Sequence, residues 1–222
     1  MATDKLLSTW DASKQQSWRG KNPDQALAFH FLLDASPSMV PYADDLMKAY
    51  NMYAIWLRHT VHPMSMAQVS SFSSTLSLCP MLPIARLSLL IAETYQPRNG
   101  ELTALYEAVG RICTEARQPG QHILIVFSDG DDNDSDPERW TAGKVSTLLS
   151  ALQDHDHWLA VYLGAFEESL ETAKAMGFRE GNTLTFAADK IAEAFKDLQY
   201  ATQKYLTAAP GERKLLAQGG IF

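Results

Sequence analysis

Nearly continuous apolar runs alternate along this chain with segments of helical periodicity. Leu27–Leu33 and Ile123–Phe127 are almost entirely hydrophobic, and Trp158–Gly164 has the same character. Strands that are buried on both faces have this composition, whereas half-exposed strands alternate polar and apolar residues. Helical segments between such strands supply the crossovers of a parallel sheet. The sequence therefore predicts an α/β fold, a doubly wound and mostly parallel central sheet with helices on both faces.

Periodicity sets the expected elements. In the segment 42–58, Leu46, Tyr50 and Tyr53 are spaced as one buried helix face requires. The runs 66–72 and 76–78 are more polar, and we expect them to form an edge hairpin with one antiparallel edge strand. The predicted helices cover 42–58, 85–93, 103–117, 141–153, 167–176 and 188–206, and the predicted strands cover 26–33, 66–72, 76–78, 122–128, 158–164 and 183–186.

The length of 222 residues suits one domain with an arm at each end. Residues 1–25 form an N-terminal polar arm, and the domain itself spans 26–206. The C-terminal tail 207–222 contains Pro and Gly pairs that break regular structure. We expect this tail to fray, apart from a docked Ile221-Phe222.

Composition disfavours several classes of partner and location. A formal net charge of −7 lacks the basic stripe of a nucleic-acid surface. No run approaches the ~18 apolar residues of a membrane span, and no secretory signal opens the chain. Cys79 and Cys113 lack metal-type spacing and suit small buried hydrophobes, with a disulfide between them left open. We therefore predict a cytoplasmic protein with neither a nucleic-acid nor a membrane partner.

Oxygen-bearing side chains follow two of the apolar runs and open a predicted helix. The carboxyl ends of parallel strands face the same crevice as the helix starts that follow them. Two carboxylates and three hydroxyls suit a hard divalent cation, with water in the remaining coordination positions. The sequence thus predicts one site for Mg²⁺ or Mn²⁺, with Ca²⁺ as a further option. Its predicted ligands are Asp34, Ser36, Ser38, Thr103 and Asp129.

Each of these residues also has a plainer interpretation. An Asp or Ser after a strand often caps the next helix, which would account for Asp34, Ser36, Ser38 and Asp129 separately. Thr103 is most simply the N-cap of the helix that it opens. The joint occurrence of all five in one order favours the metal site.

The patterns Asp34-x-Ser36-x-Ser38, Thr103-Ala104-Leu105 and Ser128-Asp129-Gly130 resemble the von Willebrand factor type A family. In that family these positions form the metal-ion-dependent adhesion site. The resemblance covers about 26–206 and departs at Pro37, where the family often has Gly. Proline pushes Ser36 toward extended backbone and can shift the hydroxyl of Ser38. The resemblance implies a bacterial, intracellular member that acts with a partner such as an ATPase or within a multi-protein stress system.

Three other polar features have plainer explanations. The acidic stretch 129–136 fails as an EF-hand loop, because Asp134 and Trp140 stand where that loop needs Gly and Glu. We predict a solvated loop whose carboxylates favour the dipole of the helix that follows. His155-Asp156-His157 is expected to be a polar connection at the opposite end of the sheet. His30, within the first strand, is expected to be a core histidine with its hydrogen bonds satisfied.

Two main function classes follow. The favoured one is a non-enzymatic, metal-dependent protein–protein interaction module, in which the cation binds an Asp or Glu of a partner. The alternative is a Mg²⁺-dependent phosphoryl-transfer or hydrolytic enzyme. Against it, Ser36 replaces the second Asp of a haloacid-dehalogenase-type phosphatase, and neither GxxxxGK[ST] nor G-x-S-x-G occurs. A third class is a scaffold whose metal site has decayed. We predict no catalytic residue.

Overall fold

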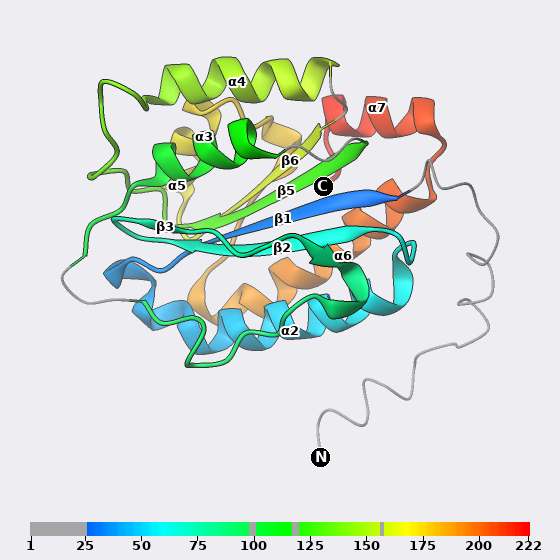
Figure 1. The fold of residues 1–222 in the computed structure, drawn as a ribbon, viewed down its shortest axis with the longest axis horizontal. Coiled ribbons are helices and arrows are strands. Elements are labelled where there is room, and N and C mark those ends of the chain that lie inside the picture. The colour runs from blue at the N-terminus through cyan, green and yellow to red at the C-terminus, as the bar shows by residue number, and fades with distance from the viewer. Residues whose placement is uncertain (1–25, 98–100, 117–119, 156–157) are drawn as a thin grey trace.

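A seven-stranded sheet lies between two layers of helices (Figure 1). The computed structural model describes residues 26–97, 101–116, 120–155 and 158–222. The strands are β1 (Leu27–Asp34), β2 (Met66–Phe72), β3 (Leu76–Ser77), β4 (Leu82–Pro83), β5 (Gln121–Ser128), β6 (Trp158–Gly164) and β7 (Thr183–Thr185). The α-helices are α2 (Ala43–Thr60), α3 (Leu105–Glu115), α4 (Ala142–His155), α5 (Glu167–Ala175), α6 (Ile191–Thr207) and α7 (Pro210–Gly219).

The strand order is β3-β2-β1-β5-β6-β7, with β4 paired to β2. All neighbours are parallel except β3 and β4, which run antiparallel to β2. The predicted mostly parallel sheet with an antiparallel edge strand is therefore confirmed. In register, Asp34 lies opposite Phe72 of β2, and Leu33 lies opposite Phe127 of β5. The carboxyl ends of three central strands consequently meet at one edge of the sheet.

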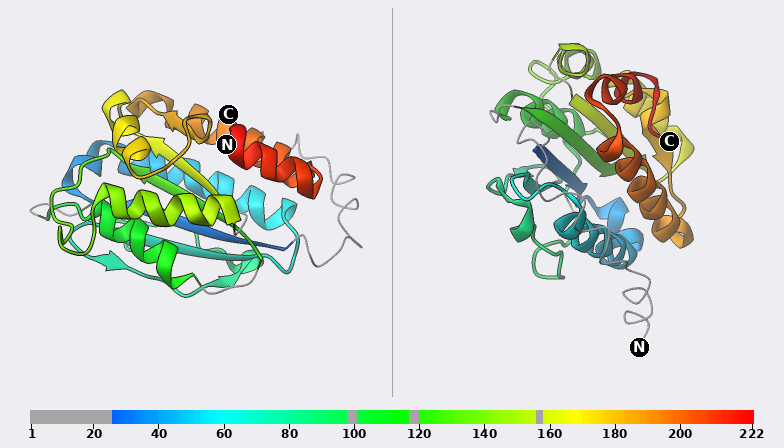
Figure 2. Two further views of the ribbon diagram at one scale, coloured as in Figure 1. Left: turned by 90° about the horizontal axis from the view of Figure 1, so that it is seen from above. Right: turned by 90° about the vertical axis from the view of Figure 1, so that its right-hand side faces the viewer.

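The continuous apolar strands are buried on both faces because helices cover both (Figures 1 and 2). Alternate residues of β1 point to opposite faces. Phe29 and Phe31 pack in the cluster that includes α2 and α6, while Leu32 packs in the cluster that includes α3 and α4. This two-sided burial holds the strand ends in fixed positions.

The predicted helix 85–93 is wrong. Only Ile84–Arg86 forms a single 3₁₀ turn, and the chain then continues without a helix to residue 97. Between Leu87 and Leu90, side chains of α2 hydrogen-bond the backbone in place of a helical turn. Asn51 donates to the carbonyl of Leu90 at 2.8 Å and accepts from its N–H at 2.7 Å, and Arg58 Nε donates to the carbonyl of Leu87 at 2.9 Å.

The expected fraying of the tail is also wrong, because α7 follows α6 almost directly. The helix begins at Pro210, which has no N–H and needs none at the first helical position. Glu212 accepts from the N–H of Ala209 at 3.0 Å, which caps the helix. The buried guanidinium of Arg213 donates to the carbonyls of Tyr205 and Leu206 at 3.1 and 2.8 Å. Arg213 therefore satisfies the end of α6 and attaches α7 to it.

The docked end of the tail is confirmed for Ile221, which is 2% exposed. Its N–H donates to the carbonyl of Gly181 at 2.9 Å and to Oδ1 of Asn182 at 3.0 Å. Gly181 and Gly220 approach so closely that a Cβ on Gly181 would lie 2.7 Å from Cα of Gly220. The tail thus ends in a specific backbone contact.

Ile221→Ala is expected to lower the free energy of unfolding by about 2 kcal/mol, because it removes a buried side chain and leaves a cavity. Phe222→Ala is the matched control, since Phe222 is 41% exposed. Urea denaturation of both variants checks this. Equal stabilities of the two variants would mean that the tail adds nothing to the core.

The remaining sequence predictions have mixed outcomes. His30 is a satisfied core histidine, as expected, with ring nitrogens 3.1 Å from Gln68 Oε1 and 3.0 Å from His122 Nδ1. Cys113 is buried, but Cys79 is exposed, and both are free thiols.

The side chains of 155–157 and the arm 1–25 lie outside the described residues, and the domain boundaries stay predictions. No helix in the described part of the chain is long and apolar enough to cross a membrane.

Candidate metal centre

Asp34 ends β1 as a carboxylate that is fully buried. Its Oδ1 accepts from the N–H of Ser36 at 2.8 Å, and its Oδ2 accepts from Oγ of Ser128 at 2.7 Å. Burial raises the pKa of Asp34 to about 7, these hydrogen bonds oppose the rise, and the charge of Asp129 adds to it. Asp34 is therefore a fixed carboxylate whose negative charge is poorly compensated.

The two serines lie at the start of the 3₁₀ helix Pro37–Tyr42. Ser36 has φ −67° and ψ 163°, the extended backbone that Pro37 imposes on the residue before it. Ser36 is buried and Ser38 is exposed, and their hydroxyl oxygens are 3.0 Å apart. Pro37 is thus compatible with both hydroxyls facing one point. Neither serine caps this helix with its side chain, in contrast to the plainer interpretation.

Asp129 follows β5 and is also largely buried. Gly130 after it has φ +94°, a left-handed conformation, and a Cβ there would lie 2.7 Å from Cα of Ser169 in α5. The close packing of Gly130 on α5 fixes the backbone beside Asp129. Ser128, before it, accepts from the N–H of Gly130 at 3.1 Å while it donates to Asp34.

Ser128 is a residue of the candidate site that the predicted ligand set left out. Its hydroxyl joins the loop after β5 to the carboxylate at the end of β1. The available signal was a hydroxyl at the last position of a buried strand, directly before Asp129. A side chain that orients a metal ligand contributes to a site without contacting the metal.

Thr103 does not cap α3, so that plainer interpretation is wrong. The N-cap of α3 is Ala104, and Thr103 precedes it as a buried residue. The N–H of Thr103 donates to Oδ1 of Asn133 at 2.7 Å, and its carbonyl accepts from the N–H of Asn133 at 2.9 Å. The N–H of Ala104 donates to the carbonyl of Ser73 at 2.8 Å. Thr103 is therefore tied both to the loop after β5 and to the end of β2.

The acidic loop caps the N-terminus of α3. The prediction that its carboxylates would favour the helix after the loop is therefore wrong. Oδ1 of Asp132 accepts from the N–H of Tyr106 at 2.9 Å and from Oγ of Ser135 at 2.6 Å. Oγ of Ser135 accepts from the N–H of Glu107 at 2.9 Å. These contacts satisfy the first N–H groups of α3 and place a carboxylate at its positive end. Asp131 and Asp134 are solvated, as predicted.

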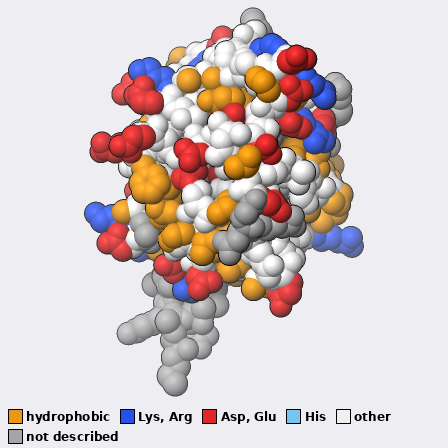
Figure 3. Space-filling model, turned by 90° about the vertical axis from the view of Figure 1, so that its left-hand side faces the viewer, with side chains coloured by type: hydrophobic (Ala, Val, Ile, Leu, Met, Phe, Trp, Pro, Cys, Tyr) orange, Lys and Arg blue, Asp and Glu red, His pale blue; other side chains and the backbone are white. Residues whose placement is uncertain are grey.

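These contacts bring the predicted residues to one edge of the sheet, which faces the viewer in Figure 3. Asp34, Ser36 and Ser128 are joined by hydrogen bonds, Asp129 is near enough to raise the pKa of Asp34, and Thr103 is linked through the loop 129–134. The described residues contain no group of three His, Cys, Asp or Glu side chains placed to hold a metal. Two carboxylates with several hydroxyls form a set of hard oxygen donors, the kind that Mg²⁺ and Mn²⁺ prefer.

No protein-family model matches the sequence, and no curated protein matches it significantly. Several solved structures are similar in fold. The von Willebrand factor domain of the type V pili tip protein Mfa5 from Porphyromonas gingivalis has a TM-score of 0.61 at 9% identity, with 83% of this chain and 97% of that chain covered. A von Willebrand factor type A protein from Catenulispora acidiphila has a TM-score of 0.53 at 16% identity, covering 78% of this chain and 42% of that chain.

A third similar structure is proximal thread matrix protein 1 from the mussel byssus, described with zinc in its metal-ion-dependent adhesion site motif. Its TM-score is 0.56 at 14% identity, and the match covers 79% of this chain and 47% of that chain. This chain thus spans nearly all of the first structure and less than half of the other two. At these identities the likeness concerns the fold, which is the one that the sequence pattern predicted.

Proposed function

Since this chain has the von Willebrand factor type A fold, we propose that it is a metal-dependent protein–protein interaction module. A divalent cation held by Asp34, Ser36, Ser38, Thr103 and Asp129 would bind an Asp or Glu of the partner. The observation that carries this proposal is the buried carboxylate of Asp34. The groups that donate hydrogen bonds to its oxygens, the N–H of Ser36 and Oγ of Ser128, are both neutral. A cation would offset its charge and that of Asp129.

The donors favour Mg²⁺ or Mn²⁺, with Ca²⁺ as a further option, because carboxylate and hydroxyl oxygens are hard ligands. The mussel protein with zinc in its motif supports divalent-metal binding in this fold. Two carboxylates balance the charge of a divalent ion without exceeding it, and the hydroxyl ligands are neutral. The cation can therefore accept a partner carboxylate in place of a bound water, which is the chemistry of the proposed partner contact.

Mg²⁺ is expected to stabilise the protein, because a ligand that binds the native state alone raises the free energy of unfolding. At about 100-fold excess over Kd the gain is about 2.7 kcal/mol. Asp129→Asn should lose it, whereas Asp134→Asn, an exposed acid in the same loop, should keep it. Thermal unfolding with and without Mg²⁺ measures the difference. A full gain in Asp129→Asn would remove this residue from the proposed site.

The enzymatic alternative has less support. The hydroxyl of Ser36 contacts that of Ser38 at 3.0 Å and the carboxylate of Asp34, and among the described residues no His, Lys or Arg side chain is hydrogen-bonded to either serine. A nucleophile normally needs such a base. The pocket beside the site, between Ala35, Ser73 and Glu93, encloses about 80 Å³, whereas small-molecule sites have ~300 Å³ or more. We therefore propose a non-enzymatic module.

The partner and location are proposals drawn from the resemblance. We propose a bacterial, cytoplasmic protein whose partner is a protein such as an ATPase. The acidic loop suggests that the partner is basic around its single metal-binding acid, because like charges across an interface are costly.

Affinity purification from native cells tests the proposed function. We expect a protein partner that is retained with Mg²⁺, released by chelator and regained when Mg²⁺ is restored. Thr103→Ala should weaken retention without unfolding the domain, because it removes one hydroxyl from a segment held by backbone contacts. Retention that is equal in chelator would contradict a role for the cation in binding.

A further inference from the structure

Three large hydrophobic side chains lie half-exposed next to the proposed cation ligands. Val40 is 50% exposed, two residues after Ser38, and Leu102 is 48% exposed, directly before Thr103. Phe166 is 50% exposed at the N-cap of α5. We call Val40, Leu102 and Phe166 the apolar collar.

Phe166 lies at the same edge of the sheet as Asp129, because its neighbours contact the residues on either side of Asp129. The N–H of Ala165 donates to the carbonyl of Ser128 at 3.2 Å. Gly130 packs against Ser169, in the first turn of the helix that Phe166 caps. The segment that carries Phe166 therefore flanks Asp129.

The backbone holds the collar side chains in exposed positions. Val40 lies in a 3₁₀ helix before Pro41, whose φ is fixed, and beside the buried Met39. The N–H of Leu102 donates to Oγ of Ser74 at 2.8 Å. The ring of Phe166 packs edge-on against Tyr42, with centroids 6.2 Å apart. Exposed apolar surface that adjoins polar residues is typical of interaction surfaces.

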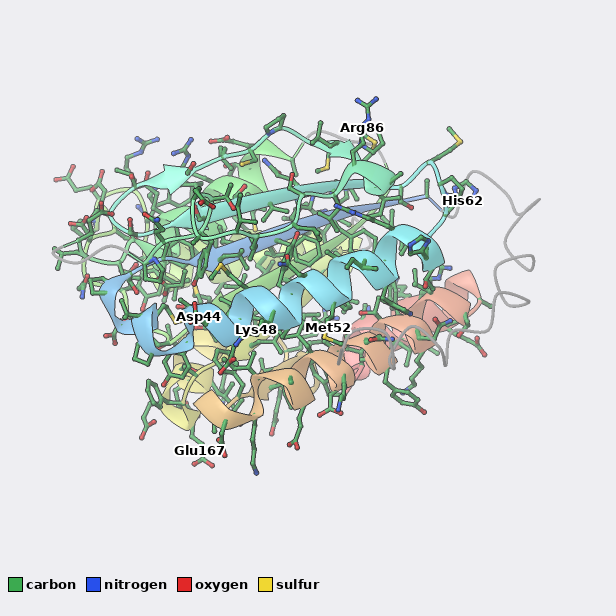
Figure 4. The ribbon with its side chains drawn as sticks, turned by 90° about the horizontal axis from the view of Figure 1, so that it is seen from below. Asp44, Lys48, Met52, His62, Arg86 and Glu167 are labelled. Atoms are coloured by element: carbon green, nitrogen blue, oxygen red, sulfur yellow. The ribbon has the colours of Figure 1, made fainter. Side chains whose placement is uncertain are left out.

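Exposed acids surround this edge and disfavour a second copy of the chain as the occupant. Asp44 and Asp45 begin α2, where Asp45 is paired with Lys48 at 2.9 Å. Glu167 and Glu168 begin α5, and Asp131 lies in the loop after β5. Figure 4 shows Asp44 and Glu167 at the same end of the molecule, away from His62 and Arg86. Two copies that met through this face would bring like charges together, so the charge pattern fits a different protein.

We propose that the apolar collar selects protein segments in which apolar side chains flank the metal-bound acid on both sides. This inference rests on the proposed function. In an extended segment, successive residues are ~3.3 Å apart, so the immediate neighbours of a cation-bound Asp or Glu lie over the rim of the site. The collar supplies that rim with hydrophobic surface, and basic residues of the partner would face the acids farther out.

A displayed peptide library with a fixed central Glu tests the proposal. Peptides are captured on the full chain in Mg²⁺ and eluted with chelator. We expect Leu, Ile, Val, Phe or Met to be enriched beside the Glu. The variant V40S/L102S/F166S should lose this preference and bind individual selected peptides about tenfold more weakly or worse. Leu215→Ser, which alters an exposed side chain of α7, is the control and should bind like the wild type.

The outcomes separate the two proposals. Mg²⁺-dependent peptides with no apolar preference, or with the same preference in V40S/L102S/F166S, would overturn the collar and leave the proposed function intact. In another outcome, Mg²⁺ raises the melting temperature of the protein but chelator elutes no peptide from the library. That outcome would overturn the recognition of acidic segments and, with it, the proposed role of the collar. Melting temperatures of all variants verify that each is folded.

Discussion

Asp34→Asn is expected to stabilise the cation-free protein by about 2 to 4 kcal/mol above pH 7 while it removes the stabilisation by Mg²⁺. The reason is the buried negative charge. The pKa of Asp34 rises from 3.8 to about 7 on folding, which corresponds to about 4 kcal/mol of destabilisation when the carboxylate is ionised. Asn removes the charge and can still accept from the N–H of Ser36.

The pH dependence of this effect has a definite sign. Because the folded-state pKa is raised, the cation-free wild type becomes less stable as pH rises from about 4 to about 7, and the full penalty is present above that range. The advantage of Asp34→Asn should therefore shrink as pH falls toward 4. Asp131→Asn, an exposed acid near the site, is the control. Chemical denaturation across pH in chelator provides the measurement, and a destabilised Asp34→Asn above pH 7 would refute the charge explanation.

Acid should destabilise the protein through His30 by about 3 kcal/mol between pH 6.5 and 4. Burial, and after it the charge of His122, lower the pKa of His30 from 6.5 to about 4, although the hydrogen bond with Gln68 opposes the shift. A lowered histidine pKa means that the unfolded chain binds the proton first. The stability is therefore complete above about pH 6.5 and is lost as pH falls toward 4.

The His30 effect is opposed in the wild type by protonation of Asp34 over almost the same pH range. The background Asp34→Asn removes that opposing contribution. In the Asp34→Asn background, His30→Gln should reduce the loss of stability on acidification, because Gln keeps hydrogen-bonding capacity without a titrating ring. His59→Gln, on an exposed position of α2, is the matched control. If His30→Gln loses as much stability on acidification as its parent, groups other than His30 cause that loss.

The sheet could be predicted from the sequence because its main strands are specified locally. β1, β5 and β6 coincide with the predicted strands within one residue at each end, since burial on both faces requires an apolar composition. Four of the five predicted ligands, all but Thr103, lie at or just after the ends of β1 and β5, and parallel pairing of these two strands is sufficient to bring those ends together.

Other elements depend on residues that are distant in sequence. The segment after Ile84–Arg86 is not a helix because Asn51 and Arg58 of α2 hydrogen-bond its backbone. The tail folds as α7 because it can dock on Gly181 and Asn182, although its own Pro and Gly residues indicate a break. Asp132 caps a helix that precedes it in the chain, which a local pattern cannot indicate.

By itself, the sequence determined the α/β architecture and the set of oxygen donors, because hydrophobic periodicity and residue type are local properties. The tertiary structure alone decided the electrostatic state of that set. Ser128 of β5 reaches Asp34 of the neighbouring strand β1, and burial under both helical layers removes the water that would otherwise solvate the carboxylate. Desolvation is a property of the packed fold. The pKa of Asp34 is therefore raised, and a cation is expected to stabilise its carboxylate, only when the sheet and its helices are assembled.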